Sequence, residues 1–446
     1  MNTHPARGMR DFLPEDVRRR QYVMGVIAGV YQRYGFEPLE TPAAENIETL
    51  MGKYGEEGDR LIFRILKRGE EGKGGGADLA LRYDLTVPLA RVVAQYRAQL
   101  PKFFKRYQVQ PVWRADRPQK GRFREFYQCD VDAIGSTSLV VEAELLGAAA
   151  EVLQRLGFDN FKIRLNHRRL LSAVLSDAGI DASLHGTALV ALDKLDKTSP
   201  EAVAAELSAR GVTAEAAAAM LARLSAGLTG DVALEGAADV REIVRLCEHT
   251  PAAGRIAVDL SLARGLSYYT GAIFEIAVPD LSGSLGGGGR YDELVGMFLG
   301  QQVPACGISL GLERILVVMG ERGMFPSTLS AAPADVMVTI CNFNDGVDEL
   351  ELKAEALQLA AQLRSGGMSV EVFPEVSELG KQVKYAGDRG IPFATVIGAR
   401  ERGAGLVGLR DLTSRKQQDL SIGELVTYLQ DQKPSADGRK PGASRG

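Results

Sequence analysis

The sequence predicts an α+β protein with three parts: a strand-rich part flanked by helices, a helical insertion within it, and a C-terminal α/β domain. Three observations support this fold class. Residues 103–135 show two strand-like runs around a polar turn, residues of about 180–253 are rich in Ala, Leu, Glu and Arg with almost no aromatics, and from about residue 333 strand and helix patterns alternate. The chain of 446 residues, 45% of them apolar, can bury sizeable cores.

The N-terminal elements follow from periodicity. Apolar residues between Val17 and Tyr34 recur at helical spacing until Gly35, so we expect a helix there, followed by an extended piece that ends at Pro42. The glycine-rich segment 69–77 is expected to be a loop that joins two strands, because no helix follows it as a phosphate-binding loop would require.

The later elements are predicted from apolar runs bounded by Gly, Pro and polar turns. The strand-rich part should contain a long antiparallel hairpin (108–114 and 123–133), a helix at 138–156, strands at 161–165, 256–260, 268–278 and 305–310, and a helix from 312. The C-terminal domain should contain strands 336–340, 369–373 and 393–397 and helices 345–364, 377–389 and 422–432. Such alternation favours a compact domain with a parallel or mixed sheet.

These patterns set the expected domain limits. The strand-rich domain comprises 1–178 and 254–328, the helical insertion 179–253, and the C-terminal domain 333–432. The tail 433–446 carries Pro, Gly, Ser and basic residues and is expected to be disordered.

Composition excludes several classes of protein. No window approaches 18 uninterrupted apolar residues, and residues 1–20 lack the apolar core of a secretory signal, so we expect no membrane span and no export. The four cysteines lie far apart without a C-x-x-C pair, which argues against a disulfide framework or a four-ligand zinc site and for a reducing cytoplasm. With a net charge of −4, any contact with nucleic acid must come from local basic patches.

The first candidate cluster is the segment 81–88, where Asp84 and Thr86 stand two residues apart. On an extended strand they would point to the same face and could together accept from an ammonium group. The alternative is a strand-to-helix junction in which one of them caps the helix.

The second cluster is the hairpin 112–132. Five cations (Arg114, Arg117, Lys120, Arg122 and Arg124) fall within eleven residues, with aromatics between them. Guanidinium groups suit phosphate oxygens and an aromatic face suits a purine. On the second strand, the even positions from 122 to 132 share a face that would run from cations through Phe126 to Gln128, Asp130 and Asp132. The alternative is a solvated hairpin held by salt bridges.

The third and fourth clusters lie in the second half of the strand-rich part. Arg264 and Gly265 precede Tyr268 and Tyr269, which could line a ligand site or simply pack in a core. The glycine run 286–289 lets a backbone lie against a ligand, and Arg314 follows a strand and a turn. Neither segment matches a phosphate-binding loop or a dinucleotide fingerprint.

At these clusters the sequence resembles the class II aminoacyl-tRNA synthetases, and within that class the histidyl-tRNA synthetase family. Segments 264–270 (Arg-Gly-Leu-Ser-Tyr-Tyr-Thr) and 287–292 (Gly-Gly-Gly-Arg-Tyr-Asp) are similar to its two signatures, and the piece ending at Pro42, the hairpin after Arg114 and segment 311–314 are similar to the general class II motifs. Two departures are Ser267, where many relatives carry Asp, and Asp116, where the class usually carries Glu.

The resemblance implies an antiparallel catalytic sheet, a helical insertion, a C-terminal anticodon-binding domain and a homodimer formed through the first motif. It implies a ligase of protein biosynthesis that joins L-histidine to tRNA(His) through a histidyl-adenylate, with ATP as substrate, Mg²⁺ entering with ATP, and no metal held by protein ligands. It leaves as rivals a histidine-sensing regulatory paralogue of ATP phosphoribosyltransferase and a class II synthetase for another amino acid.

The resemblance also implies residue roles. Arg114 would contact the α-phosphate, Arg122 and Arg314 would hold the outer phosphates, and Phe126 would stack on adenine. Asp84, Thr86 and Gln128 would take the α-amino group, and Asp132 with Tyr269 would contact the imidazole; Tyr268 belongs to the same histidine-binding set. Arg264 would lie at the reacting carboxylate and α-phosphate, which makes Arg264 and Arg114 the expected catalytic residues. The basic turn is the expected contact for the acceptor end of tRNA, through Arg117, Gln119 and Lys120.

General acid–base chemistry by histidine is not expected. The only histidines are His4, His167, His185 and His249, and none falls in the clusters. Attack of a carboxylate on an α-phosphate needs positioning and charge stabilisation, which arginines supply.

Overall fold

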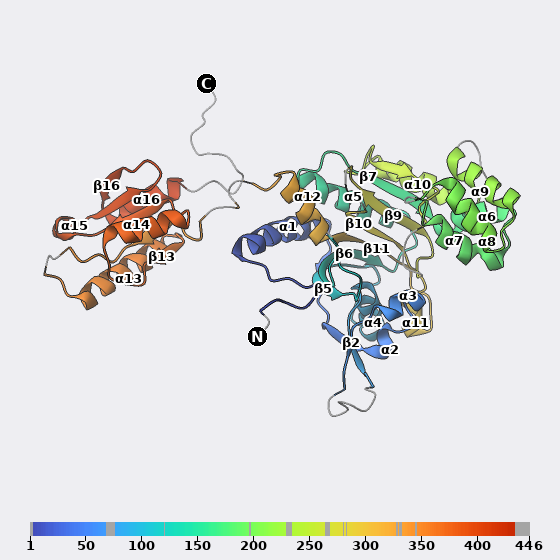
Figure 1. Cartoon of the computed structure of the whole chain (residues 1–446), viewed down its shortest axis with the longest axis horizontal. Coiled ribbons are helices and arrows are strands. Elements are labelled where there is room, and N and C mark those ends of the chain that lie inside the picture. The colour runs from blue at the N-terminus through green and yellow to red at the C-terminus, as the bar shows by residue number, and fades with distance from the viewer. Residues whose placement is uncertain are drawn as a thin grey trace, which may run out of the picture. The chain divides into compact units, whose positions relative to one another are not determined.

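The computed structural model describes two compact units, one ending at Phe325 and the other beginning at Pro326 (Figure 1). The described residues are 3–67, 76–119, 121–195, 198–228, 234–263, 268–279, 281, 283–326, 329, 332–343 and 346–432, without the side chains of residues 56 and 57. Within them, no helix combines the length and the apolar character that crossing a membrane requires.

The N-terminal unit is built on an eight-stranded mixed sheet. In spatial order its strands are β1 (Glu37–Pro38), β5 (Phe104–Trp113), β6 (Glu125–Ile134), β11 (Ala305–Gly311), β10 (Gly286–Arg290), β9 (Ala272–Ala277), β7 (Lys162–His167) and β8 (Ile256–Val258). The six central strands pair antiparallel, as expected, whereas the edge strands β1 and β8 pair in parallel with β5 and β7. Each parallel pair is joined by a long stretch of chain, which parallel pairing requires.

One face of this sheet is covered by helices. They are α1 (Pro14–Arg33), α5 (Val140–Arg155), α10 (Ala237–Cys247) and α12 (Leu312–Glu321). The odd residues Cys129, Val131 and Ala133 of β6 are buried in the core that these helices form. Because side chains alternate along a strand, the even residues of β6 point to the opposite face, which carries the candidate site.

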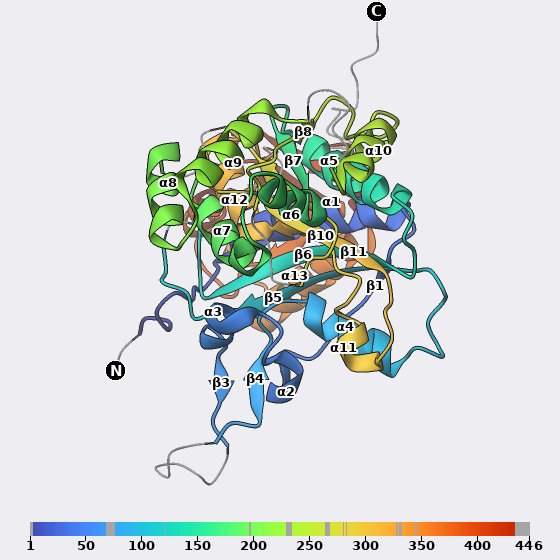
Figure 2. The same cartoon turned by 90° about the vertical axis from the view of Figure 1, so that its right-hand side faces the viewer.

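The opposite face is bordered by a smaller substructure. It comprises a sheet of β2 (Ala44–Asn46), β4 (Leu79–Leu81) and β3 (Arg64–Ile65) with helices α2 (Ile47–Leu50), α3 (Gly55–Arg60), α4 (Thr86–Gln95) and α11 (Gly296–Leu299) (Figure 2). Strands β3 and β4 flank the glycine-rich segment 69–77, of which residues 69–75 lie outside the described residues. A second core, which includes Leu89, Tyr268 and Tyr291, fills this region.

The region predicted as an insertion is helical. It holds a 3₁₀ turn (Ala182–Leu184), α7 (His185–Leu192), α8 (Pro200–Ala209), α9 (Ala214–Ala226) and also α10, which packs on α5. Helix α6 (Arg168–Asp177) ends just before the expected limit at residue 179 and gathers with α7 to α9 in one cluster beside the sheet (Figures 1 and 2). Ser199 and Thr213 cap α8 and α9 by accepting from Ala202 N and Ala216 N.

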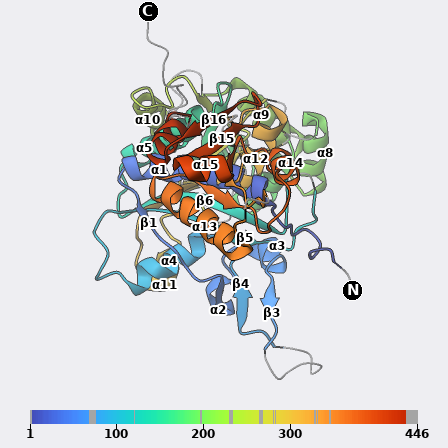
Figure 3. The same cartoon turned by 90° about the vertical axis from the view of Figure 1, so that its left-hand side faces the viewer.

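The C-terminal unit has its own five-stranded mixed sheet (Figure 3). The order is β13 (Val370–Val372), β12 (Val336–Val338), β14 (Phe393–Val396), β15 (Val407–Asp411) and β16 (Gln417–Leu420), with helices α13 (Glu349–Ser365), α14 (Leu379–Asp388), α15 (Ala399–Ala404) and α16 (Ile422–Gln432). The first three strands are parallel and the last two antiparallel. The tail 433–446, expected to be disordered, lies outside the described residues.

Candidate active site

A cavity of about 380 Å³ opens on the face of the large sheet that the helices leave free. It brings together most of the predicted site residues: Asp84, Thr86, Arg114, Arg122, Phe126, Gln128, Asp132, Tyr268, Tyr269 and Arg314. Arg117 and Gln119 lie at the exposed hairpin turn and do not line it. Arg264 and Lys120 lie outside the described residues.

Strand register assembles the floor of the cavity. Gln128, Asp130 and Asp132 of β6 stand opposite Gln110, Gln108 and Arg106 of β5. On the other side, the same three residues face Gly311, Ser309 and Gly307 of β11. The expected common face of the even positions is therefore present from Phe126 to Asp132, while Arg124 turns away and donates to Asp116 O.

Asp84 is a buried hydrogen-bond acceptor in the lining of the cavity. Its Oδ1 accepts from Tyr54 (2.9 Å) and from the Val87 N–H (3.1 Å), and its Oδ2 accepts from Tyr268 (3.1 Å). Burial raises the pKa of Asp84, and these donors and the nearby Arg114 oppose the rise. Burial also raises the pKa of Tyr268, which keeps its hydroxyl a donor.

Asp84 and Thr86 do not converge through strand alternation, so that part of the prediction is wrong. Strand β4 ends at Leu81 and Thr86 is the first residue of α4, so the two side chains meet at a turn into a helix. The Val87 N–H bond gives Asp84 the capping contact that was the alternative. Both residues nevertheless line the cavity, so capping and ligand binding are compatible here.

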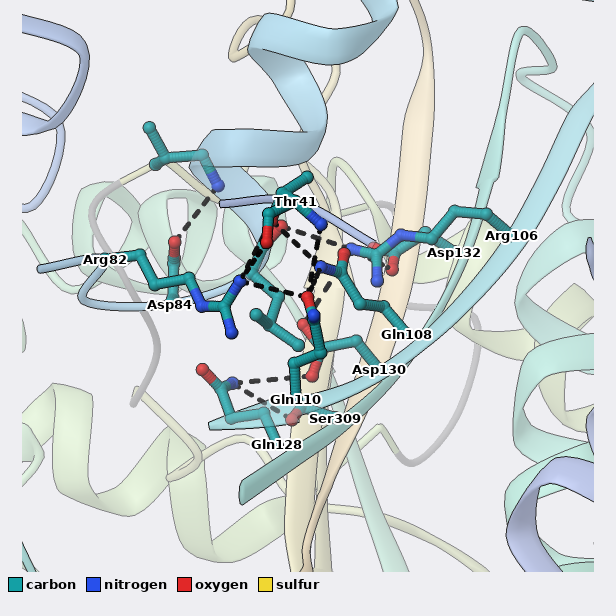
Figure 4. A network of polar contacts seen from close by, with 12 residues as sticks. Thr41, Arg82, Asp84, Arg106, Gln108, Gln110, Gln128, Asp130, Asp132 and Ser309 are labelled. Carbon is teal, nitrogen blue, oxygen red and sulfur yellow. Dashed lines mark hydrogen bonds and ion pairs between the residues drawn. The ribbon is translucent and has the colours of Figure 1, made fainter. Parts of the chain in front are cut away.

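A buried cation stands next to two carboxylates on the cavity floor. The Arg106 side chain is fully buried, and its Nη2 lies 2.9 Å from Asp132 Oδ2 and 3.9 Å from Asp130 Oδ2 (Figure 4). Tyr291 donates its hydroxyl proton to Asp132 Oδ1. Burial raises the pKa of Asp132, while Arg106 and Tyr291 lower it.

Gln128 connects this floor to β11. Its Nε2 donates to Ser309 Oγ at 3.0 Å and lies 3.5 Å from Asp130 Oδ1 (Figure 4). Its Oε1 is buried and finds no hydrogen-bond donor among the residues described. A ligand N–H group in the cavity would satisfy that oxygen.

Part of the cavity lining is cationic and aromatic. The Arg114 guanidinium donates from Nε to Tyr83 O (3.0 Å) and lies 4.4 Å from the ring centre of Tyr83 and 5.2 Å from that of Phe126. Arg122 pairs with Asp116 at 2.9 Å, so the aspartate that departs from the class pattern still partners a cation.

Buried contacts fix the start of α12, which carries Arg314. Glu313 accepts from Arg20 Nη1 (2.9 Å) and from the Tyr127 N–H (3.0 Å). Arg314 itself donates to Ser284 O at 2.6 Å. A cavity lined by carboxylates and phenols and by guanidinium groups with aromatic rings suits an ammonium-bearing substrate beside a nucleotide.

Sequence reasoning missed several residues of this site: Tyr54, Arg106, Asp130, Tyr291 and Ser309. Asp130 had been placed on the correct face without a role. Arg106 lies on β5, the strand that pairs with β6. Its position opposite Asp132 depends on the register between these two strands, which the sequence alone does not give. Among the described residues, no three His, Cys, Asp or Glu side chains are grouped as a metal site requires.

Comparison with known families decides among the candidates. The family model for histidyl-tRNA synthetase matches residues 8–315, more than half of the chain. The chain belongs to the histidyl-tRNA synthetase family. A second model, for an anticodon binding domain, matches residues 335–432.

Individual relatives agree with this placement. The histidine–tRNA ligase of Gloeobacter violaceus is 41% identical, covering 94% of this chain and 97% of that protein. A crystal structure of histidyl-tRNA synthetase from Nostoc sp. PCC 7120 matches with a TM-score of 0.80 at 29% identity, covering 97% of this chain and all of that one. A Bacillus halodurans protein described as an ATP phosphoribosyltransferase regulatory subunit/histidyl-tRNA synthetase shares the fold, with a TM-score of 0.70 at 22% identity, covering 86% of this chain and 96% of that one.

The predicted resemblance and fold class are thus confirmed. Membership of the histidyl-tRNA synthetase family accounts for both units: the mixed sheet with its flanking helices, and a C-terminal anticodon-binding domain with a sheet of its own.

Proposed function

We propose that this chain ligates L-histidine to tRNA(His) in two steps, through a histidyl-adenylate made from ATP. The observation that carries the proposal is that one cavity is lined both by carboxylates and phenols and by the cations Arg114, Arg122 and Arg314. Histidine–tRNA ligases at about 40% identity over nearly the whole chain support the same activity.

Histidine would occupy the acidic part of the cavity. Its α-amino group is a donor and suits Asp84, Thr86 and the unsatisfied Oε1 of Gln128. Imidazole carries a donor and an acceptor, which Asp132 and Tyr269 can match, with Tyr268 holding Asp84 in place. An apolar side chain of similar size would leave these buried groups unpaired, which is the physical basis of selectivity.

ATP would occupy the cationic part of the cavity. Phe126 offers a face for adenine, Arg114 suits the α-phosphate, and Arg122 and Arg314 suit the outer phosphates. Mg²⁺ would arrive with ATP and be held largely by phosphate oxygens. Arg264, assigned by the resemblance to the reacting groups, would act with Arg114 by neutralising charge as the carboxylate attacks the α-phosphorus.

The remaining assignments concern tRNA, assembly and location. Arg117, Gln119 and Lys120 of the hairpin turn would contact the acceptor end, and residues 335–432 would bind the anticodon stem-loop. We further propose a homodimer through the motif that ends at Pro42, the domain limits given above, and the cytoplasm as the site of action. Four buried, free cysteines suit a reducing compartment.

The regulatory paralogue is the second candidate because a protein so described shares the fold. The match to an anticodon binding domain at 335–432 and the cations Arg114, Arg122 and Arg314 that line the cavity favour the ligase. Pyrophosphate exchange separates the candidates: we expect exchange that depends on histidine and on none of the other nineteen amino acids. Exchange driven by another amino acid, or none at all, would refute the proposal.

Removing an imidazole contact should affect one substrate only. Asp132→Ala or Tyr269→Phe is expected to raise the KM for histidine by about 10–100-fold, since one buried polar contact is worth about 1–3 kcal/mol. The KM for ATP should change little, because other side chains of the cavity are proposed to hold ATP. Equal losses for both substrates in steady-state exchange kinetics would contradict the assignment.

A side chain at position 307 should also weaken histidine binding, because it would displace the Asp132 carboxylate. A Cβ at this position would lie 1.9 Å from Asp132 Oδ1, so Gly307→Ala must displace the carboxylate from Arg106 or from Tyr291. We expect the KM for histidine to rise about tenfold or more, the scale of the 1–3 kcal/mol that overpacking typically costs. Gly320→Ala, where the added methyl meets nothing within 4 Å, is the matched control and should behave as wild type.

A further inference from the structure

Asp130 is a buried carboxylate of the cavity floor to which none of the roles above has been given. It is 2% exposed and lies between Gln108 of β5 and Ser309 of β11 by strand register, with its side chain on the cavity face. Arg106 is the nearest cation, and its Nη2 is 1.0 Å closer to Asp132 (2.9 Å) than to Asp130 (3.9 Å). Asp132 therefore takes the direct ion pair, and Asp130 keeps mainly neutral neighbours.

The charges around Asp130 do not balance. Two carboxylates and one guanidinium, all nearly or fully buried, leave one excess negative charge when both carboxylates are ionised. The other titratable groups that act on Asp130 are Asp84 across the cavity and the neutral Tyr269, Tyr31 and Cys129. Among the residues that the structure describes, none of these groups supplies a second positive charge, so this part of the pocket floor can take up one proton.

We propose, resting on the function proposed above, that Asp130 is a specificity-determining residue that makes the pocket bind histidine together with one additional proton. The proton is shared between the Asp130 carboxyl and the imidazole ring. In one arrangement imidazolium faces the ionised carboxylate, and in the other neutral imidazole accepts from the protonated carboxyl. Both contain the same number of protons and leave the floor of the pocket neutral. An amino acid with an apolar side chain cannot take part in either arrangement.

The direction of the pH effect follows from the free pocket. Burial first, and then Asp132, raise the pKa of Asp130 to about 7, against Arg106 and Ser309, which lower it. Above that pH the free pocket and free histidine are both largely without the proton, so the complex must take it from solvent. When histidine displaces water from the cavity, Asp130 is desolvated further, which raises its pKa and favours the proton-bound complex.

Titration calorimetry of the full-length protein with L-histidine tests this. At pH 8, binding heats measured in phosphate and in Tris give the number of protons exchanged. We expect about one more proton taken up by the wild type than by Asp130→Asn, whose amide cannot titrate. Between pH 7 and 8.5, the affinity of the wild type should fall by up to about tenfold per pH unit relative to that variant. The α-amino group of histidine titrates with both proteins and cancels in the comparison.

Two controls keep the result interpretable. Asp388→Asn removes an exposed carboxylate in the C-terminal unit and should show the wild-type proton uptake. Because the pKa of Asp130 is raised on folding, the wild-type fold loses stability as pH rises from about 4 to about 7, and Asp130→Asn should melt at the same or a higher temperature at pH 8. Equal proton uptake by wild type and Asp130→Asn would overturn the proposal. Absence of histidine binding at every pH would instead refute the proposed function.

Discussion

Replacing Arg114 with alanine is expected to slow histidine-dependent pyrophosphate exchange by about 10²–10³-fold, the scale of losing one preorganised contact to a charge that develops in the transition state. The guanidinium is held before any substrate arrives: Nε donates to Tyr83 O, and the rings of Tyr83 and Phe126 both lie close to it. The loss should therefore appear mainly in kcat, with a smaller change in the KM for ATP. Single-turnover adenylate formation would measure the chemical step directly.

The matched control is Arg97→Ala, which removes an exposed arginine of the same unit and should leave exchange unchanged. Arg264→Ala is expected to lower the adenylation rate by at least about 10²-fold, because the resemblance assigns it to the same reacting groups. Near-normal exchange by Arg114→Ala or Arg264→Ala would contradict the catalytic role proposed for that arginine.

The largest expected effect on stability comes from Arg106→Met. The arginine is fully buried beside two carboxylates, so its removal leaves Asp132 and Asp130 without a cation in the protein interior. Deleting one partner of a buried ion pair typically costs about 3–5 kcal/mol, and we expect a loss of this size in the free energy of unfolding from urea denaturation at pH 7.5. The loss should shrink at pH 5, where the carboxylates can take up protons.

A combined variant separates charge from packing. Adding Asp130→Asn and Asp132→Asn to Arg106→Met removes all three charges and should recover much of the lost stability. If the triple variant is as unstable as Arg106→Met alone, the cost arises from packing around the arginine rather than from unpaired carboxylates.

The sequence predicted the site best where local chain geometry determines it. Even positions of β6 share a face because strand side chains alternate, so Phe126, Gln128 and Asp132 could be grouped correctly. Arg106 could not be found, because its contact with Asp132 depends on the register between two strands that only the folded hairpin sets. Strand alternation was expected to bring Asp84 and Thr86 together. In the structure they meet instead because the chain turns into α4, which begins at Thr86.

The elements of the fold were likewise predictable where local sequence determines them, and not where pairing with distant segments does. Apolar runs and breakers predicted many of the strands and helices, but not β10 of the large sheet or β15 and β16 of the C-terminal unit. Strand β16, with the sequence Gln-Gln-Asp-Leu, has no alternating apolar face and forms because β15 offers it a partner. The edge strands of the large sheet are parallel because of long-range connections that no local pattern reveals.

Strand β6 carries both Phe126, which we propose faces adenine, and the carboxylates that we propose face the imidazole, at two-residue intervals along about 20 Å of backbone. A single inserted or deleted residue between Phe126 and Asp132 would rotate every side chain beyond it into the helical core and bring Cys129 or Val131 into the pocket. Within the family, length changes should therefore accumulate in the hairpin turn and be absent from this strand. The number of residues between Phe126 and Asp132 would therefore set the distance between the two proposed substrate positions.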